Sequence, residues 1–240
     1  MTNLSTEPVH TIRGGPVGHG LAVLALRPAL LLAGALILQA GQVWAGYMNV
    51  VMVIVDVITI ALLARLMQRQ GGTLKDLIGP NRGIKDLGWI ALTFVIVTVG
   101  FIACSFAANL ITYGGAPPMG ADAGIKPPVW LGIWSLTIMP ITIAIAEELA
   151  YRGYGMHSLT KVWPKVVAVV VMAVFFGLQH IPLSMESPQA MLARFLTTFF
   201  AGLVFGALVL WQKRLVPVIA AHWLLDVLFL GLPMLMWSLS

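Results

Sequence analysis

The stretch IAIAEELAYR, residues 143–152, contains the charges around which the chain is organised. Glu147 and Glu148 follow an apolar run that begins near Val129. A charge at the centre of a bilayer costs about 2.5–3.5 kcal/mol on insertion scales, so these carboxylates need partners or a function. On a helix, Glu148 and Arg152 lie four positions apart on one face, which predicts an ion pair, whereas Glu147 points about 100° away and is left without a counter-ion. The alternative is a helix end that has reached the lipid headgroups, where Glu and Arg are ordinary.

The composition indicates an integral membrane protein. Hydrophobic residues make up 59% of the 240 positions and charged residues 10%, with a mean hydropathy of +0.93. Soluble domains are about 25% charged. The net charge of +5 is spread over separate loops, so we expect no nucleic-acid partner. The single cysteine, Cys104, excludes an intramolecular disulfide and a cysteine-based metal site.

Seven apolar runs are long enough to cross a bilayer, because a helix that rises about 1.5 Å per residue needs ~20 residues to span the hydrocarbon. We therefore predict an all-α fold, a polytopic transmembrane helix bundle of about seven spans. The expected spans are residues 21–41, 44–66, 88–111, 129–151, 164–183, 192–211 and 216–236.

The chain divides into three expected parts. Residues 1–20 are predicted to form a cytoplasmic N-terminal tail, residues 21–128 the N-terminal transmembrane helices with their loops, and residues 129–240 a catalytic helical core. The first apolar run has no obvious small-residue cleavage site, so we interpret it as an uncleaved span.

Basic residues gather in alternate loops, which predicts the orientation in the membrane. The loops on the other side carry only Lys126 and Arg194. By the positive-inside rule the N-terminus is expected in the cytoplasm and the C-terminus outside. The basic loops contain Arg65, Arg69, Lys75, Arg82 and Lys85, then Arg152, Lys161 and Lys165, then Lys213 and Arg214.

Two charges interrupt the first spans, Arg27 next to Pro28 and Asp56 in an apolar run. An intramembrane carboxylate usually faces the bundle interior, so we interpret Asp56 as structural and bonded to a neighbouring helix. Residues 68–86 predict a short interfacial helix and turn, and the Gly- and Pro-rich loop 113–128 predicts an irregular segment.

Further polar groups appear at helical spacing in the second half. Phe176 and His180 are four residues apart, as are His222 and Asp226. Each histidine alone is more often a packing residue, but together with Glu147 they come from three helices, which is how sites in bundle cores are built. A carboxylate and an imidazole can deprotonate a water, and a second imidazole can stabilise the oxyanion on a peptide carbonyl. The same inventory of Glu147, His180 and His222 also matches a catalytic zinc set, although no His-Glu-x-x-His motif is present.

The ordered set Glu147-Glu148-x-x-x-Arg152, Phe176-x-x-x-His180 and His222-x-x-x-Asp226 resembles the signature of the CPBP family of intramembrane proteases. That family contains the CAAX prenyl endopeptidases and the bacterial Abi, or bacteriocin-processing, proteins. The resemblance covers about residues 129–236 and implies an integral protein of a bacterial cytoplasmic membrane.

The resemblance also implies roles for these residues. Glu147 and His180 would activate water, His222 would stabilise the oxyanion, and Glu148, Arg152 and Phe176 would support them. Asp226 stands where the eukaryotic-type enzymes have Asn and bacterial members have Asn or Asp. An ionised Asp226 would repel an oxyanion, so here it is expected to orient His222 or to stay protonated.

The expected function is an intramembrane endopeptidase whose peptide or protein substrate, with or without a prenyl group, enters from the membrane or the cytoplasmic side. The family has been described as metalloproteases, whereas its prenyl-endopeptidase branch implies a mechanism without a required cofactor, and zinc is the alternative. The competing function is a non-enzymatic membrane protein, such as a transporter with Glu147 and Asp56 in a proton relay, or an immunity or scaffold protein.

The expected spans conflict with a shared site for Glu147 and His180. Counted from the span ends, the two residues lie at depths in the membrane that differ by more than about 15 Å. Either the fifth span extends through a kink at Pro182 to about Ser187, or the fourth span starts deeper and continues to Ser158. The residues alone favour neither solution.

Overall fold

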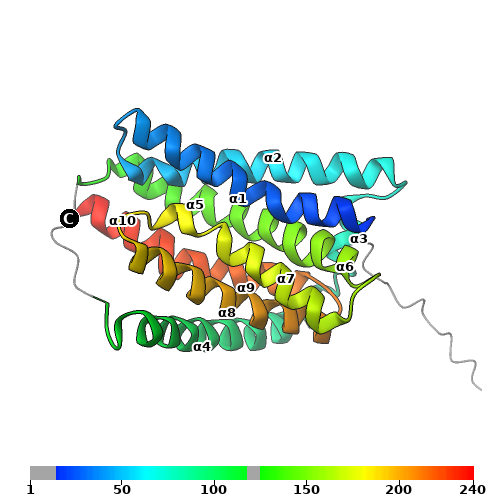
Figure 1. The fold of residues 1–240 in the computed structure, drawn as a ribbon. Coiled ribbons are helices and arrows are strands. Elements are labelled where there is room, and N and C mark those ends of the chain that lie inside the picture. Colours follow the sequence, from blue (N-terminus) through cyan, green and yellow to red (C-terminus); the bar gives the residue numbers. More distant parts are fainter. Residues whose placement is uncertain (1–14, 118–124) are drawn as a thin grey trace, which may run out of the picture.

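The structure is a computed structural model that describes residues 15–117 and 125–240. Figure 1 shows long helices that lie side by side, with α1 and α2 along one edge of the bundle and α4 along the opposite edge. Seven helical segments of the described part are long and apolar enough to cross a membrane, which confirms the predicted all-α transmembrane bundle. Most of the expected N-terminal tail, residues 1–14, lies outside the described residues.

Most helices follow the expected spans to within a few residues at their ends, and the fourth span is longer than expected. The α-helices are α1 (Val17–Ala40), α2 (Met48–Arg69), α3 (Leu74–Ile78), α4 (Asp86–Tyr113), α5 (Val129–Glu147), α6 (Met156–Leu159), α7 (Lys165–Leu178), α8 (Pro188–Gln212), α9 (Val216–Asp226) and α10 (Leu232–Leu239). The short 3₁₀ and π segments are η1 (Ala45–Tyr47), η2 (Gly83–Lys85), η3 (Glu148–Gly155), η4 (Ile181–Leu183) and η5 (Val227–Gly231).

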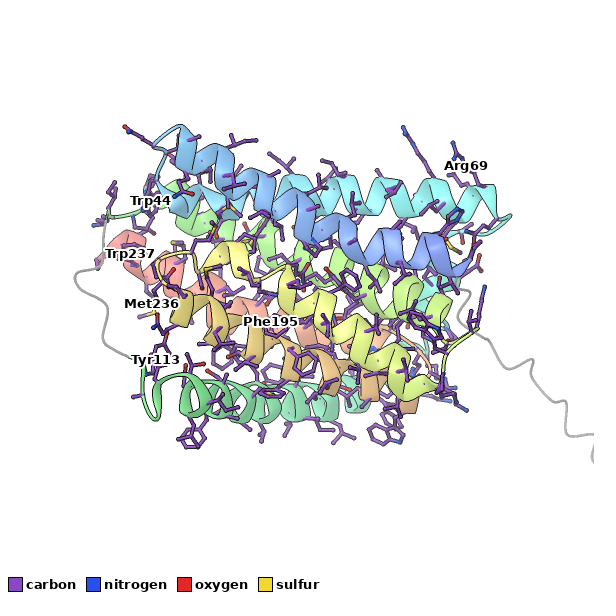
Figure 2. The ribbon with its side chains drawn as sticks, in the orientation of Figure 1. Trp44, Arg69, Tyr113, Phe195, Met236 and Trp237 are labelled. Carbon is purple, nitrogen blue, oxygen red and sulfur yellow. The ribbon has the colours of Figure 1, made fainter. Side chains whose placement is uncertain are left out.

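The two ends of the bundle differ in chemistry. Trp44 lies against the rings of Tyr47 and Trp237 at one end, with centroid distances of 5.8 and 6.1 Å, while Arg69 lies at the other end (Figure 2). Aromatic rings are typical of the membrane–water interface, and clustered basic residues are typical of the cytoplasmic side. We call these the aromatic end and the basic end. The short helix predicted within residues 68–86 is present as α3, and its Leu77 is fully buried.

The fourth span continues beyond the boundary expected at residue 151. The π-helix η3 follows α5 directly and leads into α6, so the candidate span runs from Val129 to Leu159. Glu147 is thus 12 residues from the basic end of its span, and His180 is 15 residues beyond Lys165. At about 1.5 Å per residue these are similar depths, near 18 and 22 Å. The continued fourth span, the second of the two alternatives, therefore removes most of the difference in depth.

Two π-helices occur within the spans, and each begins directly after a candidate site residue. The segment η3 starts after Glu147, and η5 starts after Asp226. A π segment changes the direction in which the following side chains point, and such segments are frequent at functional sites. Their positions at these two carboxylates indicate that the local helix geometry serves a site.

The first two helices pack directly on the span that carries the Glu pair. Helix α2 contacts α5, and helix α1 contacts η3 and α7. On the other side α4 packs against α8 and α9. The outward surface is apolar, as in Val99 and Phe106 of α4, which are 62% and 68% exposed. Side chains of this kind suit contact with lipid tails.

Candidate active site

Four predicted catalytic residues lie around one small internal cavity of about 90 Å³. Phe176, which was predicted to support them, also lines it. Glu147, His180 and His222, which were expected to form one site from three helices, therefore line one cavity. The polar and aromatic side chains that line it include Arg27, Glu147, Phe176, Gln179, His180, Arg194, Phe205, His222 and Asp226.

The predicted ion pair between Glu148 and Arg152 is present. Arg152 Nη1 donates to Glu148 Oε1 over 3.2 Å, and both side chains are fully buried. The same carboxylate oxygen lies 2.8 Å from Nδ1 of His222 on α9. Since a carboxylate only accepts, this contact makes His222 Nδ1 the donor. Glu148 therefore fixes the orientation of the His222 ring.

The aromatic rings nearest to the guanidinium of Arg152 are those of Phe176 and Phe205. The Cζ atom of Arg152 lies 4.0 Å from the ring centroid of Phe176 and 4.9 Å from that of Phe205. The attraction of a cation to the face of an aromatic ring strengthens when both are removed from water. Phe176 also contacts the ring of His180, and Phe205 contacts that of His222, each with a centroid distance of 4.9 Å. The supporting position predicted for Phe176 thus has a physical basis, because its ring joins Arg152 to His180.

The prediction that Glu147 has no counter-ion is wrong. Arg27 on α1 donates through Nη2 to Glu147 Oε1 over 3.1 Å and through Nη1 to Asp56 Oδ1 over 2.6 Å. Both contacts are buried, and Arg27 is only 1% exposed. The prediction was based on positions around one helix, so it covered only partners within that helix. Arg27 lies 120 residues earlier in the chain, on a different helix. Asp56 is bonded to a neighbouring helix, as predicted.

Only one oxygen of Glu147 is occupied by Arg27. The other, Oε2, is buried and makes no hydrogen bond with any described residue. It lies 3.8 Å from His222 Nε2. Glu147 is therefore held by one oxygen and keeps the second for another partner.

Gln179 and Tyr151 also belong to the site, although sequence reasoning did not select them. Gln179 Oε1 accepts from Arg27 Nε and from the hydroxyl of Tyr151, both over 2.9 Å. Both residues are fully buried. Each stands beside a selected residue in sequence, but a glutamine or tyrosine in a membrane helix is a weak signal by itself. Arg27 was noticed as a polar exception, and the opposite charges of Arg27 and Asp56 in two spans could have suggested their pairing.

His180 has a defined tautomer. Its Nδ1 lies 2.7 Å from the carbonyl oxygen of Phe176, one turn earlier. Because a carbonyl only accepts, Nδ1 carries the proton and Nε2 presents a lone pair when the ring is neutral. Nε2 forms no hydrogen bond with the described residues, and the ring lines the cavity. His180 can therefore accept a proton from a molecule in the cavity.

Asp226 lies beside His222 but does not form a hydrogen bond with it. Its Oδ2 is 3.6 Å from His222 Nε2 and has no hydrogen-bond partner among the described side chains. The Nε2 atom thus has Glu147 Oε2 and Asp226 Oδ2 near it, at 3.8 and 3.6 Å. When Nε2 carries a proton, the positive ring has a carboxylate on each side, which stabilises it electrostatically.

The candidate zinc ligands do not form a compact group. Within residues 15–117 and 125–240, no set of three or more His, Cys, Asp or Glu side chains is arranged to hold a metal ion. Glu147 and Glu148 each direct one oxygen to an arginine, and His222 Nδ1 is bonded to Glu148. The protein groups of the site thus bond mainly to one another.

A second, larger cavity of about 950 Å³ has Trp237 of the aromatic end among its lining residues. Its wall is mostly apolar, and Arg194 is its one basic lining residue among the described residues. Arg194 Nε donates to Ser184 Oγ over 3.0 Å. Five residues line both cavities, which connects the site to the larger space: Met52, Leu183, Arg194, Phe229 and Leu230.

Comparison with known proteins agrees with the resemblance. No curated protein and no solved structure matches the chain. Residues 128–228 match the family model described as type II CAAX prenyl endopeptidase Rce1-like. This range includes Glu147, His180, His222 and Asp226, and it excludes Arg27 and Asp56. Residues 128–228 are therefore similar to the Rce1-like type II CAAX prenyl endopeptidases, which agrees with the resemblance carried by the three motifs.

Proposed function

We propose that the protein is an intramembrane endopeptidase that uses Glu147 and His180 to activate a water molecule. The observation that carries the proposal is the small cavity inside the bundle, where the free Oε2 of Glu147 and the rings of His180 and His222 meet. A water molecule takes up about 30 Å³ in the liquid, so a cavity of about 90 Å³ accommodates a water next to a reacting bond. A carboxylate and an imidazole in such a position are suited to general acid–base chemistry.

In the proposed reaction, a water in the small cavity gives a proton to Glu147 Oε2 or His180 Nε2 as its oxygen attacks the peptide carbonyl. The carbonyl oxygen becomes an oxyanion in the tetrahedral intermediate. When the intermediate collapses, the C–N bond breaks, and the proton passes to the nitrogen of the leaving amine. The products are a carboxylic acid and an amine, so atoms and charges balance without a redox partner.

His222 is the proposed donor to the oxyanion in its protonated form. Glu148 accepts from Nδ1 and so directs Nε2 toward the cavity side of the ring, near Glu147 and Asp226. A positively charged donor stabilises negative charge that develops in a site without bulk water. We propose that Asp226 orients this ring and stabilises its charge.

The larger cavity is the proposed route for the substrate. Its volume of about 950 Å³ and its apolar wall fit a peptide segment with a hydrophobic group. Because the two cavities share lining residues, a substrate in the larger cavity is next to the small cavity that contains Glu147 and His180. The matched family is described as prenyl endopeptidases that act on the CAAX motif. A farnesylated peptide that ends in Cys-aliphatic-aliphatic-X is therefore the first substrate to test.

The test is cleavage of that peptide, and of its unprenylated form, by the purified protein in liposomes. We expect Glu147→Gln to lower kcat by about 10²–10⁴-fold, which is the usual contribution of a positioned acid–base group. The matched control is Asp76→Asn, since Asp76 lies on the exposed side of α3, where it accepts from the backbone N–H of Thr73. This control should cleave at the wild-type rate. If the wild-type protein cleaves neither peptide, the transporter or scaffold alternative is favoured.

The same preparation tests the role of zinc. Activity that survives exhaustive chelation, in a sample whose elemental analysis shows no stoichiometric metal, supports the mechanism without a metal. Stoichiometric zinc, with activity that disappears on its removal and returns on its addition, would instead make Glu147, His180 and His222 ligands.

A further inference from the structure

The orientation of the Gln179 side-chain amide is fixed by its two donors. Arg27 Nε and the Tyr151 hydroxyl both lie 2.9 Å from Oε1. A guanidinium can only donate, so the atom that faces Arg27 must be the amide oxygen. The NH₂ group of Gln179 therefore occupies the other position of the amide, turned away from these donors.

This NH₂ group is buried without a partner. Gln179 is 0% exposed, and Nε2 forms no hydrogen bond with any described residue. Buried polar groups are nearly always paired, and an unpaired donor is costly to the folded protein. An unpaired buried donor in a native protein calls for an explanation, and a catalytic role is one of the known explanations.

Gln179 lines the small cavity beside Glu147 and directly precedes His180 in the chain. An acceptor atom in this cavity could therefore receive a hydrogen bond from Nε2. The reaction proposed above creates such an acceptor, because the carbonyl oxygen of the substrate gains negative charge as water attacks.

His222 is poorly suited to hold this oxyanion alone. Its Nε2 has carboxylate oxygens at 3.6 and 3.8 Å, and both carboxylates repel a third negative oxygen when they are ionised. Oxyanion sites are often built from more than one neutral or positive donor. A second donor away from the carboxylate oxygens would complete the site.

We propose that Gln179 is a further catalytic residue whose Nε2–H donates a hydrogen bond to the substrate oxyanion. This inference rests on the proposed peptidase function. It gives Tyr151 and Arg27 the role of positioning residues, because they hold the amide oxygen and so direct the NH₂ group. Asp56 acts one step further away by holding Arg27.

Two variants of Gln179 separate donation from simple packing. Gln179→Met removes both polar atoms with little change in volume and no change in charge. Gln179→Glu keeps an acceptor for Arg27 and Tyr151 and removes the NH₂ donor. With the farnesylated CAAX peptide as substrate, we expect both variants to lose about 10²–10³-fold in kcat, with KM changed less than about threefold. If Gln179 only holds Arg27 and Tyr151, Gln179→Glu should cleave almost as fast as the wild type.

Gln212 provides the matched control. It is also a glutamine in a membrane helix, but its Nε2 donates to Thr93 Oγ1 over 2.7 Å and it does not line either cavity. Gln212→Met and Gln212→Glu should retain the wild-type kcat. A comparable loss in these variants would show that any change at a buried glutamine lowers activity, which would overturn the specific role of Gln179.

A measurement on the wild-type protein covers the case in which the Gln179 variants do not fold. A phosphinic peptide imitates the tetrahedral intermediate, and in a solved complex Gln179 Nε2 should lie within about 3.2 Å of a phosphinate oxygen. A separation above about 4 Å, or a folded Gln179 variant with kcat within threefold of the wild type, would overturn the inference. Failure of the proposed function is a different result, since then the wild-type protein itself cleaves no peptide.

Discussion

Two buried arginines hold the candidate site, and they do so in different ways. Arg27 donates a hydrogen bond from each of its three guanidinium nitrogens. The acceptors are Asp56, Glu147 and Gln179, which belong to three other parts of the chain. Arg152 has one bonded carboxylate, Glu148, four residues away in its own helix. Its Nε and Nη2 have no hydrogen-bond partner among the described residues, and aromatic rings lie near the guanidinium instead.

Arg27 therefore connects distant parts of the chain, whereas Arg152 stabilises only its own region. Arg27 joins α1 to α2, to α5 and to the end of α7, so it ties the N-terminal helices to the matched domain. Arg152 lies within that domain and supports the motif in which it stands. Removal of either charge leaves a buried carboxylate without its cation, but Arg27 has two such carboxylates and Arg152 has one.

The largest effect is expected for Arg27→Met. The substitution leaves Asp56 and Glu147 buried and without their cation, and breaking a buried ion pair in this way costs about 3–5 kcal/mol. We expect a much lower thermal unfolding midpoint in detergent, together with loss of peptide cleavage. The double variant Arg27→Met/Asp56→Leu removes one of the two unpaired carboxylates, so it should recover part of the stability but not the activity. An Arg27→Met protein as stable as the wild type would mean that Arg27 and Arg152 do not differ as the contacts suggest.

The same contrast explains how far the sequence could predict this structure. Spans of about 20 apolar residues follow from the thickness of the bilayer, and the Glu148–Arg152 pair follows from helical periodicity, so both were predicted. The partner of Glu147 was not, because a contact across 120 residues depends on how helices pack and leaves no periodic signal. Gln179 and Tyr151 were missed for a related reason, since their importance arises from Arg27. The continuation of the fourth span was one of two alternatives, and the choice between them depended on the π-helix η3, which apolar run length does not reveal.

A smaller effect is expected at Arg152, where Arg152→Met and Arg152→Lys can be compared. The Met variant takes one donor from Glu148, which keeps its contact with His222 Nδ1, so we expect a loss of about 2–3 kcal/mol. The Lys variant keeps the charge but loses the planar group between the rings, and should lose about 1–2 kcal/mol. The measurements are the unfolding midpoint, the folded yield and kcat of each variant. A fully stable but inactive Arg152→Met would place Arg152 in contact with the substrate instead.

The smallest effect, about 1 kcal/mol, is expected for Phe205→Leu, which removes a ring that lies 4.9 Å from Arg152 Cζ, farther away than the ring of Phe176 at 4.0 Å. Phe199→Leu on the same helix is the control for ring loss, because the ring contacts of Phe199 are with Phe195 and Phe200 and not with an arginine. A double-mutant cycle then separates the two arginines. If the Phe205 ring acts on the guanidinium, Phe205→Leu should lower the free energy of unfolding clearly less in the Arg152→Lys background, because the planar group is already absent there. In the Asp56→Asn background only the contacts of Arg27 change, so the loss in free energy of unfolding should equal that in the wild type. Equal costs in all backgrounds would show that Phe205 contributes by packing alone, and Arg152 would then depend on Phe176 and Glu148 for its position.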